Sequence, residues 1–111
     1  MQINRGEVWS VLWTGLAGKP RPALVIQSEK YRTSETDILA LITTADSVQG
    51  DFRLPIVADE KNGLLKDSYV CLDKLMAIPL DKLGKCYGKV SSEIMHDVDE
   101  RLIRILGIGE V

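Results

Sequence analysis

The sequence predicts an α+β fold that is mostly β: a small, strongly curved antiparallel sheet, closed on itself as a barrel, followed by a carboxyl-terminal helix. Short runs rich in Val, Ile and Leu, separated by Gly, Pro, Asp and Asn, dominate the first 80 residues and indicate strands. The last third of the chain changes to a helical period. With 111 residues, 45% of them hydrophobic, the chain can bury one core but not two. Residues 1–111 are therefore expected to form a single domain.

The first expected strand, residues 7–13, carries apolar side chains on both of its faces, which indicates a strand covered on both sides. Residues 14–20 follow as a loop, because two glycines and a proline favour turns over a continuing ladder. Pro55 removes a ladder donor from the fourth strand, so that strand is expected at an edge or a bulge. The other expected strands are residues 22–27, 37–44, 52–57 and 68–78, and the last of these is expected to bend.

A helix is expected after residue 90. Ser91 or Ser92 can cap it, Glu93 is favourable in its first turn, and Gly107 is a stop signal. A short helical turn is also expected around residues 80–83. The apolar residues that recur at helical spacing are Ile94, Val98, Leu102 and Ile105.

Charge and cysteine content exclude several classes of protein. The net charge of −2 and the isoelectric point near 5.4 exclude binding of polyanions by bulk positive charge, so any nucleic-acid site must be a local patch. Cys71 and Cys86 have no CxxC or histidine partner nearby, so we expect reduced thiols and no zinc site or disulfide. No apolar run approaches the roughly 18 residues of a membrane span, and the amino terminus lacks the apolar core of a signal peptide. A soluble, cytoplasmic protein is expected.

Arg21 stands between Pro20 and Pro22, just before the second expected strand. Each proline fixes its own φ and restricts the residue before it, so the arginine is held stiffly. A rigid guanidinium suits a phosphate or a developing phosphorane, because its forked donors match the oxyanions. Thr43 and Thr44 end the third strand, where their hydroxyls can donate to a phosphate or a ribose. Taken alone, these residue types are also ordinary on a strand surface.

As an ordered set, the motifs of this chain resemble those of the MazF/PemK/Kid toxins, and the resemblance spans essentially the whole chain. The matching stretches are residues 5–9, a glycine-bearing loop, and residues 21–26, 41–44, 63–70, 72–75 and 91–99. The resemblance implies a CcdB/PemK-type, SH3-like barrel that forms a homodimer. It also implies a toxin that cleaves single-stranded messenger RNA at selected sequences without a metal or other cofactor, and that is inhibited by a cognate antitoxin.

In that family the ribose 2′-hydroxyl attacks the adjacent phosphate and leaves a 2′,3′-cyclic phosphate and a 5′-hydroxyl. Carried over by motif, Arg21 is expected to stabilise the phosphorane, and Thr43 to hold the phosphate or orient the attacking group. The residues expected to form the local RNA-binding patch are Lys19, Arg32, Thr44 and Arg53.

This chain departs from the family pattern at two places. Residues 15–19 form a shorter loop than usual, without the Glu-Gln pair, and Met76 stands where many members have an arginine. Both changes touch surfaces that would meet RNA, so the resemblance does not fix the base preference. His96 is the single histidine, so the two-histidine pair of ordinary cyclising ribonucleases is absent. The acidic side chains of Asp97, Asp99 and Glu100 are interpreted as a solvated helix face and not as a metal site, because consecutive helical positions point in different directions.

Two alternatives stay open from the sequence. A CcdB-like toxin shares the barrel but acts by binding DNA gyrase, without catalysis. A phosphate-clamping arginine paired with strand-end hydroxyls favours the nuclease over that alternative. A catalytically inactive barrel that serves as an adaptor is the second, and the shortened loop is compatible with it.

Overall fold

The computed structural model describes residues 2–12, 18–45 and 50–111. Trp13 and residues 14–17 of the expected first loop lie outside these ranges. Within them the chain forms six strands, three short 3-10 helices and one α-helix. The strands are β1 (Glu7–Val11), β2 (Arg21–Val25), β3 (Thr36–Thr43), β4 (Arg53–Ile56), β5 (Ser68–Pro79) and β6 (Leu83–Lys89). The helices are η1 (Glu29–Tyr31), η2 (Gly50–Phe52), η3 (Leu80–Lys82) and α1 (Ser92–Ile105).

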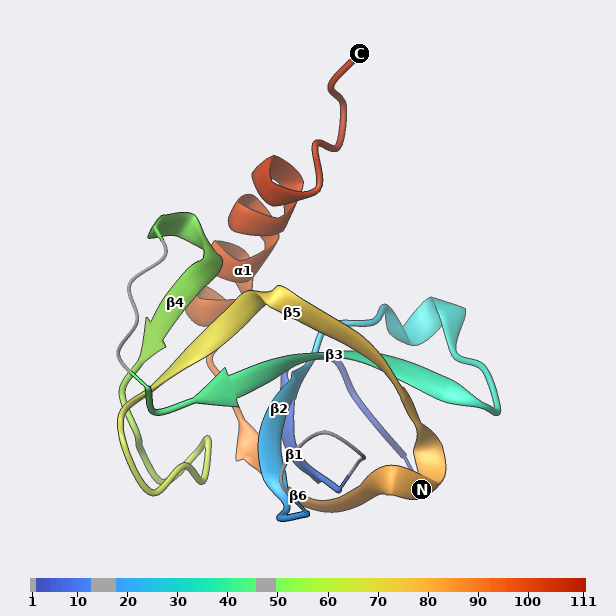
Figure 1. Cartoon of the computed structure of the whole chain (residues 1–111), viewed down its shortest axis with the longest axis vertical. Helices are drawn as coiled ribbons and strands as arrows, with labels where there is room; N and C mark the ends of the chain where they lie inside the picture. The colour runs from blue at the N-terminus through green and yellow to red at the C-terminus, as the bar shows by residue number, and fades with distance from the viewer. Residues whose placement is uncertain (1, 13–17, 46–49) are drawn as a thin grey trace.

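The strands form one antiparallel sheet in the order β4-β5-β3-β2-β1-β6 (Figure 1). All five expected strands are present, with bounds that differ by a few residues. The edge position expected from Pro55 is confirmed, because β4 pairs with β5 alone. The bend in β5 is also confirmed: the partner of β3 jumps from Leu75 opposite Ala40 to Cys71 opposite Leu41.

The expected closure into a barrel is wrong, because β4 and β6 end the sheet and do not pair with each other. β4 is a four-residue strand, and Pro55 has no backbone N–H to offer to a further strand. The turn that follows β4 contacts β6 instead: the backbone N–H of Lys89 donates to the Lys61 carbonyl at 2.8 Å. The sheet is therefore strongly curved but open. Its seam is the gap between the edge strands β4 and β6, and the turn after β4 lies in this gap.

Both faces of the central strands are buried, as expected for the first strand. Along β1, Val8 packs into one hydrophobic cluster, whereas Trp9 and Val11 pack into another. The first core contains Val8, Leu24, Ala40, Ile42, Leu54, Ile56, Val70, Leu72, Val90, Val98 and Leu102. The second core contains Ile3, Trp9, Val11, Ala23, Val25, Leu39, Ile78 and Leu83.

The helix α1 covers the first core with Val98 and Leu102 and lies beside β4 and β5 (Figure 1). Its expected cap is confirmed, since the Ser91 hydroxyl accepts from the Ile94 N–H at 3.2 Å. The expected stop is confirmed as well: Gly107 follows the helix with φ +66°, a left-handed conformation that glycine adopts freely. Within the described residues, no helix is long and apolar enough to cross a membrane.

Candidate functional site

Arg21 opens β2, where it pairs with Val11 of β1, and its side chain is exposed. The β2–β3 register pairs Ala23 with Leu41. Continued by two residues, this register brings Arg21 opposite Thr43. Residues directly opposite in an antiparallel pair point to the same face of the sheet. The observed pairing ends at Ala23 and Leu41, and its extension directs Arg21 and Thr43, the two residues expected to be catalytic, to the same face of the sheet.

Thr43 pairs on its other side with Tyr69 of β5. Tyr69 and Thr43 therefore lie side by side across β5 and β3, and the extended β2–β3 register puts Arg21 on the same face of the sheet. The Thr43 hydroxyl oxygen accepts from the backbone N–H of Ala45 at 3.1 Å, which fixes the oxygen and leaves the hydroxyl proton able to donate to a ligand. Sequence reasoning missed Tyr69, because the position of a residue in a row depends on register between distant strands.

A groove of about 420 Å³ opens at the same end of the sheet. Pro20 and Pro22, the neighbours of Arg21, form part of its wall. Its remaining described lining comprises Thr44, residues 63–66, Ser68 and Tyr87. Because successive strand residues point to opposite faces, the groove and the row with Arg21 lie on the two sides of the same strand ends.

The structure distributes the other expected RNA-binding residues unevenly. Thr44 lines the groove, and Lys19 is exposed next to Pro20. Arg53 lies on the same sheet face as Arg21, one row away, but its Nε is 3.3 Å from the Asp73 carboxylate and its side chain is 9% exposed. Its charge is therefore already balanced by a neighbouring carboxylate.

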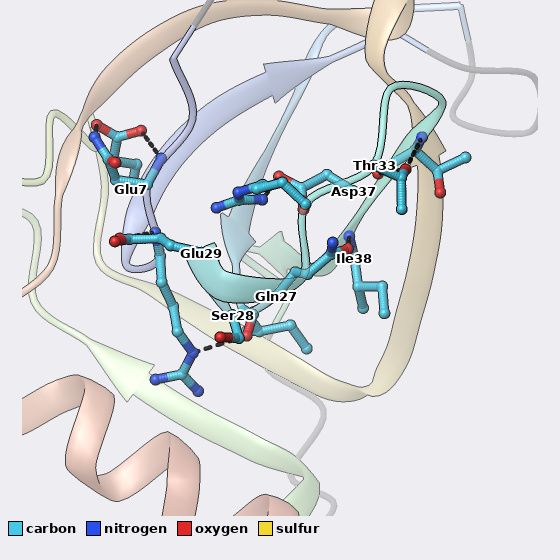
Figure 2. A network of polar contacts seen from close by, with 12 residues as sticks. Glu7, Gln27, Ser28, Glu29, Thr33, Asp37 and Ile38 are labelled. Atoms are coloured by element: carbon cyan, nitrogen blue, oxygen red, sulfur yellow. Dashed lines mark hydrogen bonds and ion pairs between the residues drawn. The ribbon is translucent and has the colours of Figure 1, made fainter.

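Arg32 lies away from the groove, near the opposite end of β3, where it forms an ion pair with Asp37. The Asp37 side chain is fully buried, and burial raises the pKa of its carboxyl while the Arg32 charge opposes that rise. Figure 2 shows the surrounding network, in which the Gln27 side chain accepts from the Ile38 N–H at 3.0 Å. Arg32 is thus held in an ion pair with a buried carboxylate and does not line the groove.

The other residues considered from the sequence lie in the core or on the surface of α1. Met76 lies opposite Leu39 and packs against the second core. Trp9 is buried in the second core. His96 is exposed on α1, and its Nε2 lies 2.9 Å from the Glu100 Oε1 one turn later. No cluster of three or more His, Cys, Asp or Glu side chains suited to a metal ion occurs in the described ranges.

Comparison with known proteins identifies the family of this chain. A model of PemK-like, MazF-like toxins of type II toxin–antitoxin systems matches residues 4–106. The chain belongs to this toxin family. The opening motifs with Arg21 and Thr43 and the terminal helix all fall within the matched range.

Curated relatives of this toxin align over nearly its full length. The chain is 32% identical to "Endoribonuclease MazF6" of Mycobacterium tuberculosis, an alignment that covers 97% of this chain and 100% of the relative. It is 28% identical to "Probable endoribonuclease MazF" of Mycolicibacterium smegmatis, which covers 96% of this chain and 99% of that protein.

Solved structures share the fold of this toxin. An endoribonuclease from a mycobacterial species, solved in complex with its cognate antitoxin, superposes with a TM-score of 0.80 at 20% identity, over 99% of this chain and 100% of that one. MazF from Deinococcus radiodurans superposes with a TM-score of 0.76, also at 20% identity, over 97% and 99% of the two chains.

Proposed function

We propose that this chain, as a single toxin domain, is a sequence-selective endoribonuclease that cleaves single-stranded messenger RNA in the cytoplasm without a metal ion. The proposal is supported by the family match, which runs nearly end to end, and by the β2–β3 register, whose extension directs Arg21 and Thr43 to one sheet face. The relatives named as endoribonucleases support the same chemistry. The family match does not favour a gyrase-binding toxin.

In the proposed reaction the ribose 2′-oxygen attacks the adjacent phosphorus and the bond to the leaving 5′-oxygen breaks. The attacking hydroxyl loses a proton and the 5′-oxygen gains one, which gives a 2′,3′-cyclic phosphate and a 5′-hydroxyl. Arg21 donates from its fork to the phosphorane oxygens, and the Thr43 hydroxyl donates to one of them. Preorganised donors of this kind each contribute about 3 to 4 kcal/mol to transition-state stabilisation. A guanidinium keeps its proton, so Arg21 acts through charge and not as a base.

We infer further that the toxin works as a homodimer. The end of α1 and the segment after it expose apolar side chains that a monomer leaves in water, namely Ile103, Leu106 and Ile108. Light scattering at micromolar concentration is expected to give twice the mass of one chain. A monomer mass would contradict this inference.

A cognate antitoxin is the proposed inhibitor. One of the similar solved structures holds an endoribonuclease together with its antitoxin. The groove offers the kind of surface that an acidic, apolar and disordered tail fits, because its lining is mostly apolar and includes Lys66. Co-expression with the gene immediately upstream is expected to restore growth of cells that make this toxin. Normal growth of cells that express the toxin alone at a high level would contradict its role.

The test of cleavage is to incubate the purified protein with a long single-stranded RNA in EDTA and to map the new ends. Cleavage with 5′-hydroxyl ends is expected, and Arg21→Ala is expected to abolish it while leaving thermal stability nearly unchanged. Lys82→Ala is the control, since Lys82 is an exposed cation on η3 that does not line the groove. Cleavage by Arg21→Ala at the wild-type rate would show the assignment to be wrong.

A further inference from the structure

Tyr87 occupies a β-bulge in β6. The β1–β6 register runs from Val8 opposite Gly88 to Trp9 opposite Cys86, so Tyr87 has no partner in the ladder. A bulge adds one residue to a strand, bends it locally and turns the side chain of that residue to a new direction. Here the side chain that is turned belongs to the groove lining.

Two close backbone contacts hold this bulge in place. A Cβ atom at Gly88 would lie 2.1 Å from the Lys61 carbonyl oxygen, and one at Gly63 would lie 2.1 Å from the Tyr87 carbonyl oxygen. The turn at residues 59–63 therefore packs backbone against backbone on the bulge, an approach that glycine permits at both positions. The direction of Tyr87 is consequently built into the fold and does not depend on a mobile loop.

The groove around Tyr87 suits a flat, apolar ligand that carries negative charge at its edges. Pro20, Pro22 and Leu64 contribute apolar wall, and Lys66 is the one charged residue among the described lining. The neighbouring Asp67 carboxylate is turned away, since it accepts from the Ala58 N–H at 2.8 Å. An unpaired nucleobase has this character, because its face stacks on an aromatic ring while its phosphates seek cations.

Further cations flank Tyr87 along the chain and across the seam. Lys85 and Lys89, two residues to either side of it in β6, are both exposed. The Lys61 carbonyl accepts a hydrogen bond from the Lys89 N–H, and the Lys61 side chain is exposed. These lysines supply local positive charge on a protein whose net charge is −2. They can neutralise the phosphates on either side of a base held in the groove.

We propose that Tyr87 is a specificity-determining residue that stacks on one unpaired base of the RNA substrate. The base is close in sequence to the phosphate bound at Arg21, because Pro20 and Pro22 join the groove to that arginine. Tyr87 does not touch the reacting atoms and acts through affinity and base preference. This inference rests on the proposed ribonuclease function and adds to it the residue that reads a base.

The test compares Tyr87→Ala, Tyr87→Leu and Tyr87→Phe with Tyr31→Ala. Tyr31 is the matched control, because its side chain is 77% exposed on η1 and does not line the groove. The first readout is the base frequency around the cut sites in a randomised single-stranded RNA. The second is the dissociation constant, by fluorescence anisotropy, of a labelled oligonucleotide with the mapped cut sequence and a 2′-deoxy sugar at the scissile position. Thermal melting establishes that each variant is folded.

Loss of the ring is expected to weaken binding about 5- to 140-fold, which is 1 to 3 kcal/mol of stacking at 1.4 kcal/mol per tenfold. Base preference is expected to relax at one position in Tyr87→Ala and Tyr87→Leu, and to persist in Tyr87→Phe and Tyr31→Ala. Tyr87→Leu removes the ring but keeps apolar bulk, so it tests the stacking if the alanine variant fails to fold.

Two failures are distinguishable. If the wild type cuts RNA but the alanine and leucine variants bind and select bases as the wild type does, the inference about Tyr87 is overturned and the ribonuclease stands. The inference is overturned in that case even if those variants bind a protein inhibitor less tightly. If the wild type cuts no RNA, the proposed function itself fails and the inference fails with it.

Discussion

Arg32 forms an ion pair with Asp37, and no atom of the Asp37 side chain reaches solvent. The three side-chain nitrogens of Arg32 are shielded from solvent as well. In the described structure these two charges compensate one another and have no other ion-pair partner. Removal of one member would leave the other buried and uncompensated, which is far more destabilising than loss of a surface pair.

Arg32→Ala is therefore expected to lower the free energy of unfolding by about 3 to 5 kcal/mol. Urea denaturation measures this, with Lys30→Ala as the control because Lys30 is an exposed cation on the neighbouring η1. Lys30→Ala is expected to stay within about 0.5 kcal/mol of the wild type. Equal stability of the two variants would show that the buried pair does not stabilise the fold.

The same variant is expected to respond to pH. Burial raises the pKa of Asp37, so this carboxyl favours folding below its ordinary pKa of 3.8 and opposes folding as the pH rises through its folded value. Without the Arg32 charge the folded pKa rises further. The stability difference between Arg32→Ala and the wild type should thus be largest at neutral pH and shrink as the pH falls toward 3.8. A difference that is constant from neutral to acid pH contradicts this account.

Gly63 is expected to tolerate alanine much less than Gly50 does. Both adopt left-handed φ, +70° and +59°, which costs alanine about 1 to 2 kcal/mol at either position. At Gly63 the new methyl group would also lie 2.1 Å from the Tyr87 carbonyl oxygen, whereas no described atom lies within 4 Å at Gly50. Overpacking against backbone adds roughly 1 to 3 kcal/mol. Thermal melting of the two variants tests this, and equal losses would mean that the turn can move away from β6.

The sequence predicted most of the fold from its periodicities, because alternating and helical patterns are local properties. It did not predict β6, whose seven residues include two glycines and two lysines and carry little strand signature. Nor could it show that the sheet stays open, since closure depends on which distant edges meet. Here the seam is held by a contact between Lys61 and Lys89, 28 residues apart.

The candidate site also contains residues that local sequence patterns indicate and residues whose position depends on contacts between distant segments. Arg21 and Thr43 can be proposed from the sequence because each belongs to a recognisable local motif. Tyr87 was missed because its position depends on a bulge set by pairing with β1. The sequence predicts Arg32 and Arg53 in the RNA-binding patch, since nothing in it indicates that Asp37 and Asp73 are their partners.

The two cysteines are expected to differ in reactivity. Cys71 is buried and Cys86 is exposed, and both are free thiols. Burial raises the pKa of both thiols, so the difference between them rests on access, which the buried Cys71 lacks. A thiol-specific disulfide reagent is expected to modify one thiol per chain in the native protein and two in denaturant. Cys86→Ser should leave none reactive in the native state, and rapid reaction of that variant would contradict the burial of Cys71.

Thr43 is expected to contribute to the reaction through its hydroxyl proton. Valine has the shape and β-branching of threonine but cannot donate, so Thr43→Val removes the donor and disturbs the strand little. If the hydroxyl stabilises the phosphorane, kcat should fall about 100- to 1000-fold, the effect of losing one oxyanion donor. Thr43→Ser keeps the donor and should retain most of the activity. Thr36→Val is the matched control, because Thr36 begins the same strand that Thr43 ends. The measurement is single-turnover cleavage of an oligonucleotide with the mapped sequence. Should Thr43→Val cut at the wild-type rate while Arg21→Ala is inactive, the phosphorane would be stabilised by the arginine without this hydroxyl.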